Sequence, residues 1–285
     1  MTNYIPEEYY TQVRDSIIDT IRKQSISRQM LPARLVPGGI GTQQFTFDTA
    51  TEVSEAMLSW AFVDNAEDVV GRGREHVPIP VLHKEFRIGR RDLAAAMNGG
   101  YDLDTRTANS AAYKVAMLEN ELVVDGFAPD DSTYEIKGIY QSAGNSYSTS
   151  ADFGTPGKAL TAVEGALNKL YEDDIDMNFD MYLHPTQYLE LATSVFGEAL
   201  EGSQEMPMVE KLLGGNIIKT SWLTAGTGLI MPSECPNYFG ELIIAQDATV
   251  EFEVMPKSKD LWGRVYECVV PVIYEENAFC TLTTI

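Results

Sequence analysis

The stretch from residue 32 to residue 84 most constrains the fold of this 285-residue chain, because it cannot form a compact domain by itself. Glycine and proline punctuate it, short alternating runs such as QFTFDTATEV occur, and no helical period is sustained. Pro78 and Pro80 lack N–H donors, so VPIPV can lie only at a sheet edge or in a partly unpaired strand. We therefore expect a long extended arm or hairpin that needs another surface to lie on.

Three helices are predicted around this segment from apolar residues at intervals of three and four. Residues 6–24 form the first, with Tyr10, Val13, Ile17 and Ile21 on one face, and GRRDLAAAMNGG predicts a short one over residues 90–97. The third is long, begins at an Asp104 cap and ends before Gly126. Its apolar face consists of Ala108, Ala112, Val115, Leu118 and Leu122. Each apolar face must be buried against another part of the protein.

The second half of the chain alternates helices with strands and then turns to strands alone. SAGNSYSTSADFG reads as a polar loop, and a helix follows with Thr155 as its cap and Pro156 at its first position. FDMYLHP predicts a buried strand, Pro185 begins a helix, and MVEKLLGG predicts a helix closed by Gly214. YFGELIIAQD and TVEFEVMP predict two strands, and GRVYECVVPVIYEENAFCTLTTI predicts one long final strand. Together these elements indicate the α+β class.

The charge of the chain is strongly negative. Its 42 Asp and Glu residues against 21 Lys and Arg residues give a formal net charge of −21, which excludes a general affinity for nucleic acid. The three cysteines, Cys235, Cys268 and Cys280, are too few for a disulfide framework and indicate a reducing compartment. The N-terminus lacks the pattern of a signal peptide and no long apolar run follows, so neither export nor a membrane span is expected.

No group of residues indicates catalysis. His76, His83 and His184 are scattered away from metal-ligand spacing, and we expect a cap or loop role for His184. The run YEDDIDMNFD lacks the glycine and the terminal glutamate of a calcium loop, so its acids indicate a solvated helix end; they are Glu172, Asp173, Asp174, Asp176 and Asp180. Neither a nucleophile elbow nor a phosphate-binding glycine loop occurs. We therefore expect no enzyme activity, no cofactor and no metal.

Six basic residues gather within twenty positions of this acidic chain, in RGREHVPIPVLHKEFRIGRR. They are Arg72, Arg74, Lys84, Arg87, Arg90 and Arg91. A stripe that follows phosphates would need aromatic stacking partners, and Phe86 is the only aromatic residue in the window. The bases can instead form ordinary surface pairs with nearby acids, each worth little. In a third interpretation they meet acidic faces on neighbouring copies of the chain, where charge complementarity sets the register.

Several motifs follow one another in a family-like order. F-x-I-x-x-R-D-L precedes a long helix that ends in ENELVVDG, and IKGIYQSAG, MYLHPTQYLEL, EKLLGGNIIKTSWL and ELIIAQDATVEFEV come next. The chain ends in LWGRVYECVVPVIYEENAFCTL followed by three residues. Over residues 40–285 this order resembles the encapsulin-type branch of the Hong Kong 97 (HK97) phage capsid family.

The resemblance implies an HK97-like capsid fold with a stated division of the chain. Residues 1–44 would form an N-terminal arm and residues 45–85 an extended loop. A peripheral domain would take in residues 86–134, with the long spine helix, and residues 246–285, and an axial domain would span residues 135–245. The six basic residues would then be subunit-interface residues, because symmetry repeats the basic arm and the acidic faces in every copy.

The function that the resemblance implies is structural. Copies of the chain would form pentamers and hexamers of an icosahedral shell, without catalysis or a cofactor. In a virus, the chain would be the major capsid protein of the virion. The shell would assemble in the host cytoplasm and enclose double-stranded DNA without sequence-specific contacts. Portal and decoration proteins would be further partners, and no membrane is involved.

A second use of the same fold is the encapsulin shell, a nanocompartment that encloses cargo enzymes. It binds targeting peptides in an apolar inner groove formed partly by the N-terminal helix. Val13, Ile17 and Ile21 suit either such a groove or an arm packed on the shell interior. Because SISRQMLPARLVPGG lengthens the arm beyond the short encapsulin start, we favour a tailed-virus capsid and keep the encapsulin as the alternative. The acidic composition points to a haloarchaeal host.

Overall fold

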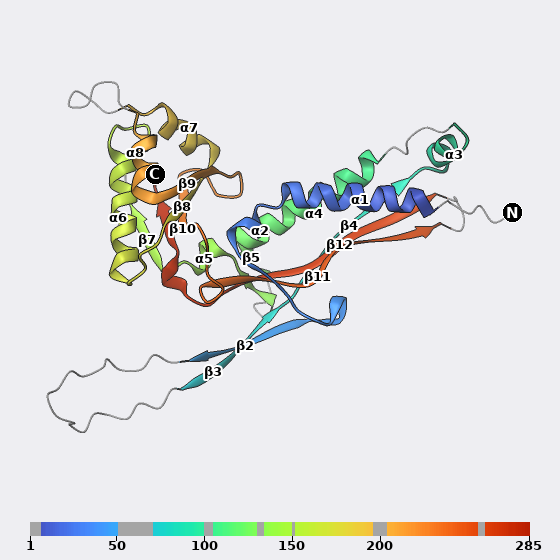
Figure 1. The fold of residues 1–285 in the computed structure, drawn as a ribbon, viewed down its shortest axis with the longest axis horizontal. Coiled ribbons are helices and arrows are strands. Elements are labelled where there is room, and N and C mark those ends of the chain that lie inside the picture. The colour runs from blue at the N-terminus through green and yellow to red at the C-terminus, as the bar shows by residue number, and fades with distance from the viewer. Residues whose placement is uncertain are drawn as a thin grey trace.

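The computed structural model describes residues 7–50, 71–99, 105–129, 134–149, 152–195, 204–255 and 260–285 (Figure 1). The helices are α1 (Glu7–Gln24), α2 (Ser27–Met30), α3 (Arg90–Gly99), α4 (Arg106–Val124), α5 (Ile139–Ser142), α6 (Lys158–Glu172), α7 (Pro185–Thr193) and α8 (Met206–Leu213), with 3-10 turns η1 (Gly39–Gly41) and η3 (Glu276–Ala278). The strands are β1 (Ala33–Leu35), β2 (Gln44–Ala50), β3 (Arg72–Pro78), β4 (Val81–Ile88), β5 (Gly126–Phe127), β6 (Ile136–Lys137), β7 (Asn145–Ser148), β8 (Phe179–Leu183), β9 (Gly214–Lys219), β10 (Thr227–Pro232), β11 (Gly240–Val254), β12 (Leu261–Ile273) and β13 (Cys280–Thr283). The α+β class is confirmed. Among the described helices, none is long and apolar enough to cross a bilayer.

A four-stranded sheet in the order β1-β11-β12-β4 forms one half of the fold. Its centre is the antiparallel pair β11 and β12, registered from Gly240 opposite Ile273 to Val254 opposite Leu261. The prediction of two strands over the β11 segment was wrong, because one strand continues through a bulge. Register shifts between Ile244 and Thr249 accommodate the polar residues of this segment as a bulge, and the strand continues on both sides of it.

The helices α1 and α4 lie side by side along this sheet (Figure 1). Val13 and Ile17 are completely buried and Ile21 is 1% exposed, so the predicted apolar face of α1 is confirmed. The predicted face of α4 was wrong at Leu118, which is 42% exposed. Glu119 and Asn120 are buried instead. Asn120 Oδ1 accepts hydrogen bonds from the N–H groups of Ile26, which precedes α2, and of Ser27, the first residue of α2.

The ends of α4 also differ in detail from the sequence expectation. The expected Asp104 cap lies outside the described residues, and Thr105 occupies the N-cap position. Gly126 follows the helix with a φ of 77°, a conformation that favours glycine, and an added Cβ there would lie 2.3 Å from the Ile136 carbonyl oxygen. The predicted helix end is therefore confirmed and tied to the β5–β6 pairing.

A five-stranded sheet in the order β7-β13-β10-β8-β9 forms the other half, with α6 and α8 packed beside it. Every residue of β8 is buried, as FDMYLHP predicted. Two predictions were wrong here. The polar loop contains β7, whose parallel partner β13 is supplied only by the tertiary fold. The long final strand is two strands, because η3 separates β12 from β13 and the two belong to different sheets.

Helix termini in this half follow local chemistry. His184 caps α7, where its ring Nδ1 accepts the Thr186 N–H at 3.3 Å, and Gly214 ends α8 with a φ of 69°. Helix α6 begins at Lys158, so the expected Thr155 cap and Pro156 start were wrong by two residues. The reason is a remote carboxylate: fully buried Glu205 accepts the N–H groups of Gly157 and Leu160. Its Oε2 also accepts a hydrogen bond from the Ser194 hydroxyl at 2.7 Å.

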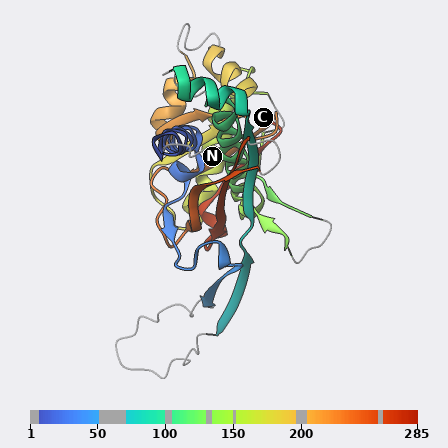
Figure 2. The ribbon, with the colours of Figure 1, turned by 90° about the vertical axis from the view of Figure 1, so that its right-hand side faces the viewer.

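In its described residues the expected extended arm is an antiparallel hairpin of β2 and β3, registered from Gln44 opposite Pro78 to Ala50 opposite Arg72, and the rest of the predicted loop, residues 51–70, lies outside the described residues. The hairpin projects from the body as a narrow ribbon (Figure 2). The chain then enters β4, which is an edge strand, so the expectation for VPIPV is confirmed. The domain boundaries stay a prediction.

The α1–α4 contact provides a matched test of burial. Ile17 is fully buried and its neighbour Ile18 is half-buried. We expect Ile17→Ala to lower the free energy of unfolding by about 2–5 kcal/mol and Ile18→Ala by about 1 kcal/mol, since only the first opens a cavity. Urea unfolding of the full chain, followed by circular dichroism, measures both. Equal losses would contradict the packing of α1 against α4.

Candidate assembly surfaces

The β2–β3 hairpin forms a sheet of its own. Among the described residues it has two strands, so each strand has one edge without a partner strand. Residues 72–76 of β3 are all exposed. An isolated two-stranded ribbon is marginal in water. The hairpin therefore depends on its anchor to the body and on whatever lies along it.

That anchor is a buried carboxylate with two aromatic neighbours. Glu241 of β11 is 5% exposed, and its Oε2 accepts hydrogen bonds from Arg34 Nη1 at 3.1 Å and from the Tyr274 hydroxyl at 3.2 Å. The Tyr274 ring meets Phe47 edge to face at 5.2 Å between centroids, and the Arg34 guanidinium lies 5.7 Å from the Phe45 ring centroid. The base of β2 is thus held by β1, β11 and the residue that follows β12.

Titration does not loosen this anchor near neutral pH. Burial above all, together with Glu241, raises the pKa of Tyr274 to about 12. The hydroxyl therefore stays a neutral donor to the carboxylate. The sequence contained no local signal for this site, because Arg34, Glu241 and Tyr274 are far apart in the chain.

The six basic residues do not form one patch. Arg74 pairs with Asp48 across the hairpin at 3.0 Å, Arg87 pairs with Asp260, and the Arg90 backbone N–H donates to Asp260 Oδ1 at 2.7 Å. Arg72, Lys84 and Arg91 are exposed, and no ion pair joins them to any residue in the described part of the chain. Ordinary surface pairing therefore describes Arg74 and Arg87, and the subunit-interface role of the six residues stays a prediction.

The charges on β4 also explain why the strand can remain an edge. Glu85 accepts a hydrogen bond from Arg264 Nη2 of β12 at 2.7 Å, and this bond lowers the pKa of Glu85. Arg264 lies 4.9 Å from the Trp262 ring centroid. Charged side chains along an edge strand discourage unspecific pairing with other strands.

The apolar face of α1 does not line an open groove in the subunit. Val13, Ile17 and Ile21 are covered by α4 and the four-stranded sheet. The interpretation of these three residues as groove-lining was therefore wrong. The physical reason is that α4 offers small residues, Ala108 and Ala112 among them, against which the branched side chains of α1 can pack closely.

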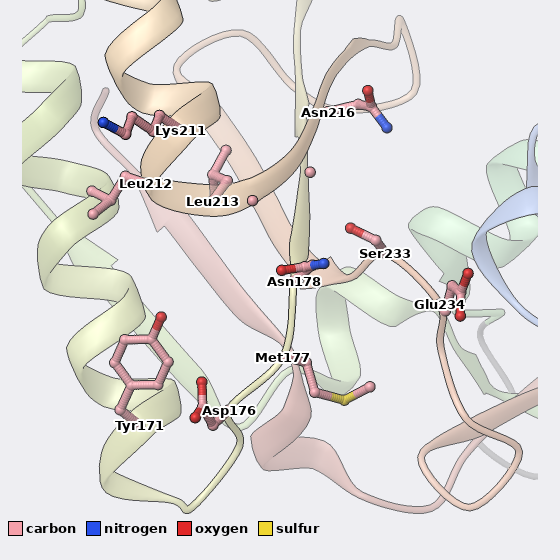
Figure 3. Close-up of a pocket in the computed structure, with 12 residues that line it drawn as sticks. Tyr171, Asp176, Met177, Asn178, Lys211, Leu212, Leu213, Asn216, Ser233 and Glu234 are labelled. Carbon is pink, nitrogen blue, oxygen red and sulfur yellow. The ribbon is translucent and has the colours of Figure 1, made fainter.

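A cavity of about 640 Å³ opens between α6, α8 and the starts of β8 and β9 (Figure 3). Tyr171, Leu212 and Met177 supply apolar surface, and the charged groups on its wall are Asp176, Lys211 and Glu234. Ser233 lines it too, but its hydroxyl donates to the buried carboxylate of Asp180 at 2.8 Å. The Ser233 hydroxyl thus satisfies a buried carboxylate that also accepts the Asn216 N–H, and no histidine lies among the described residues that line the cavity.

Two cysteine thiols and the His76 ring are held in structural roles. Burial raises the pKa of Cys235 to about 12 and, against a lowering effect of Lys169, that of Cys280 to about 11. His76 bonds the Thr46 hydroxyl at 2.8 Å. Within the described ranges, no group of three or more His, Cys, Asp or Glu side chains could hold a metal ion.

Comparisons with known proteins agree with this architecture. A family model described as "Encapsulating protein for peroxidase" (Linocin_M18) matches residues 4–269. A type 1 encapsulin shell protein of Myxococcus xanthus is 23% identical over 280 residues, covering 98% of this chain and 94% of that protein. A diheme-cytochrome–encapsulin shell fusion protein of Kuenenia stuttgartiensis is 24% identical, covering 98% of this chain and 73% of that protein.

Solved structures extend the likeness to the fold. A virus-like particle from Pyrococcus furiosus aligns with a TM-score of 0.68 at 22% identity, over 96% of this chain and 99% of that chain. The capsid of Myoviridae phage XM1 aligns with a TM-score of 0.66 at 13% identity, over 88% and 90% of the two chains. The predicted HK97-like capsid fold is confirmed, and the match to the family model over most of the sequence shows that this chain belongs to the Linocin_M18 family of encapsulating proteins.

Proposed function

We propose that copies of this chain assemble into a closed encapsulin shell that encloses cargo proteins. The observation that carries the proposal is the β2–β3 hairpin, a ribbon with open edges and no core of its own in a chain of the encapsulating-protein family. A neighbouring copy supplies the surface that such a ribbon needs. The shell itself performs no chemistry.

The encapsulin interpretation replaces the tailed-virus capsid that we favoured from the sequence. That preference rested on SISRQMLPARLVPGG as an added arm, but this segment contains α2 and β1, which are built into the body. Ala33, Arg34 and Leu35 pair with β11 in parallel. The named relatives are encapsulin shell proteins, whereas the phage capsid at 13% identity shares only the fold. Packaged DNA, portal proteins and a location in a virion belong to the viral interpretation.

The cargo class follows from the names of the relatives. The family description names a peroxidase, and two relatives are fusions of an encapsulin shell with a diheme cytochrome or with a ferritin-like domain. We therefore expect redox or iron-handling proteins inside the shell.

Purified full-length protein should migrate as a particle far larger than the 31.6 kDa chain in size-exclusion chromatography and appear as closed shells by electron microscopy. Particles from the native source should contain co-purified protein and no nuclease-protected DNA. A stable monomer over a range of salt concentrations would exclude the shell, and protected genomic DNA would restore the viral interpretation.

The exposed bases Arg72 of β3 and Lys84 of β4 give a second test. We expect Arg72→Glu combined with Lys84→Glu to reduce the assembled fraction several-fold and to leave the circular dichroism of the subunit unchanged, because neither base has an ion-pair partner among the described residues. Arg22→Glu with Lys23→Glu on the exposed side of α1 is the matched control. Equal effects of the two double variants would reject the charge complementarity.

The hairpin anchor gives a third test, with two changes at one position. Tyr274→Ala removes the ring that packs on Phe47 and should abolish most assembly. Tyr274→Phe removes only the hydroxyl bonded to Glu241, costs about 1–2 kcal/mol of subunit stability and keeps the ring contact. Electron microscopy and urea unfolding measure the two effects. If both variants assemble like the unaltered chain, the anchor does not position the hairpin.

A further inference from the structure

A buried charge cluster joins the N-terminal helices to the body, and no part of the shell proposal uses it. Arg28 of α2 lies between three carboxylates: Nε is 3.1 Å from Glu119 Oε1, Nη1 is 2.9 Å from Asp247 Oδ1, and Nη2 is 3.2 Å from Glu267 Oε2. Glu119 belongs to α4, Asp247 to the bulge of β11 and Glu267 to β12. One side chain thus connects α2 to three elements.

The two glutamates are fully buried, and each has one oxygen without a donor. Glu119 and Glu267 side chains are 0% exposed, whereas Asp247 is 49% exposed. Glu119 Oε2 and Glu267 Oε1 have no hydrogen-bond partner among the described residues when both groups are treated as carboxylates. Both carboxyl groups contact the same guanidinium, Glu119 at Nε and Glu267 at Nη2, so they lie next to each other. One proton between the two orphaned oxygens would satisfy both.

The two glutamates differ in the number of donors around them. Glu119 Oε1 accepts three hydrogen bonds, from Ser25 Oγ at 2.9 Å, Ser27 Oγ at 2.7 Å and Arg28 Nε at 3.1 Å, and this arrangement stabilises its negative charge. Glu267 Oε2 accepts a single bond from Arg28. Of the two, Glu267 has fewer donors and is therefore the better site for a proton.

We propose that Glu119 and Glu267 share one proton and that this carboxyl pair, closed over Arg28, is a pH-sensitive latch holding α2 and α1 on the body of the subunit. Loss of the proton to solvent leaves two buried carboxylates facing one guanidinium. Their repulsion loosens the contact with Ser25, Ser27 and Arg28, which are the residues that fasten the N-terminal segment.

The groups around the pair support this behaviour. Burial above all, and then the Glu119 charge, raise the pKa of Glu267 well above its ordinary value, and Arg28 only partly opposes them. Burial lowers the pKa of Arg28, but Glu119 and Asp247 raise it overall, so the guanidinium stays charged. Burial and Glu267 raise the pKa of the Cys268 thiol, which stays neutral. From β4, the residue opposite Glu267 is the apolar Leu82.

The direction of the pH effect follows from this raised pKa. The folded subunit holds the Glu267 proton more tightly than the unfolded chain does. The stabilisation is therefore complete below the ordinary carboxyl pKa and is lost as the pH rises through the raised pKa of Glu267. The latch closes on the acidic side and opens on the alkaline side.

Hydrogen–deuterium exchange of the full-length protein from about pH 5 to about pH 9 tests the latch, with peptides of β10 as the reference for intrinsic rates. We expect the protection of α1 and α2 to fall with rising pH by at most about tenfold per pH unit, the limit for one proton. In Glu267→Gln the amide keeps the acceptor for Arg28 and donates to Glu119, so the protection should become independent of pH.

Glu205→Gln is the matched control, because Glu205 is also fully buried but both its oxygens have donors. This variant should retain the pH dependence at α1 and α2. A flat profile in the unaltered protein, or an unchanged slope in Glu267→Gln, would overturn the proposal.

Infrared spectroscopy of the unaltered protein tests, without any variant, whether the carboxyl pair holds a proton. The carbonyl stretch of a protonated carboxyl should persist at neutral pH, where ordinary carboxyl groups are ionised. Its absence would show that the pair holds no proton. The latch concerns contacts inside one subunit, so it can hold or fail whether or not the shell proposal is correct.

Discussion

The long antiparallel pairing of β11 and β12 is the constraint on which the rest of the molecule depends. It gives α1 and α4 a surface to cover, and it adds β1 at one edge and β4 at the other. Its bulge turns Asp247 toward Arg28, and Glu241 near its beginning receives the hairpin anchor. Both polar contacts that fasten the N-terminal segment and the hairpin therefore use side chains of this ladder.

Buried carboxylates connect parts of the chain that sequence separates widely. Glu241 holds the base of β2, Glu119 and Glu267 hold α2, and Glu205 caps α6. A buried carboxylate is costly unless donors surround it, so each one fixes its neighbours in a specific arrangement. In a protein with a net charge of −21, these few inward acids act on the fold, while the many outward ones face solvent.

The elements that could be predicted from sequence are those with a strong local pattern. The stripe of α1, the buried run of β8 and the Gly214 stop of α8 depend on neighbours within a few residues, and all three are confirmed. The predictions failed where a distant partner decided the outcome. Ser146 and Tyr147 were predicted as loop, and they form a strand because β13 pairs with them. Leu118 is exposed and Glu119 is buried in its place, because Glu119 accepts a hydrogen bond from Ser27 of α2.

The sequence by itself determined the α+β class, the extended hairpin and the order of motifs that marks a capsid-type fold, because periodicity, proline and glycine act locally. The tertiary structure alone decided which basic residues have an ion-pair partner among the described residues, covered the apolar face of α1 with α4 and built the SISRQMLPARLVPGG segment into the body. It also brought Glu119 and Glu267 together around Arg28. These outcomes depend on which distant residues contact one another in the folded protein, and hydrophobic patterning along the chain indicates only local structure.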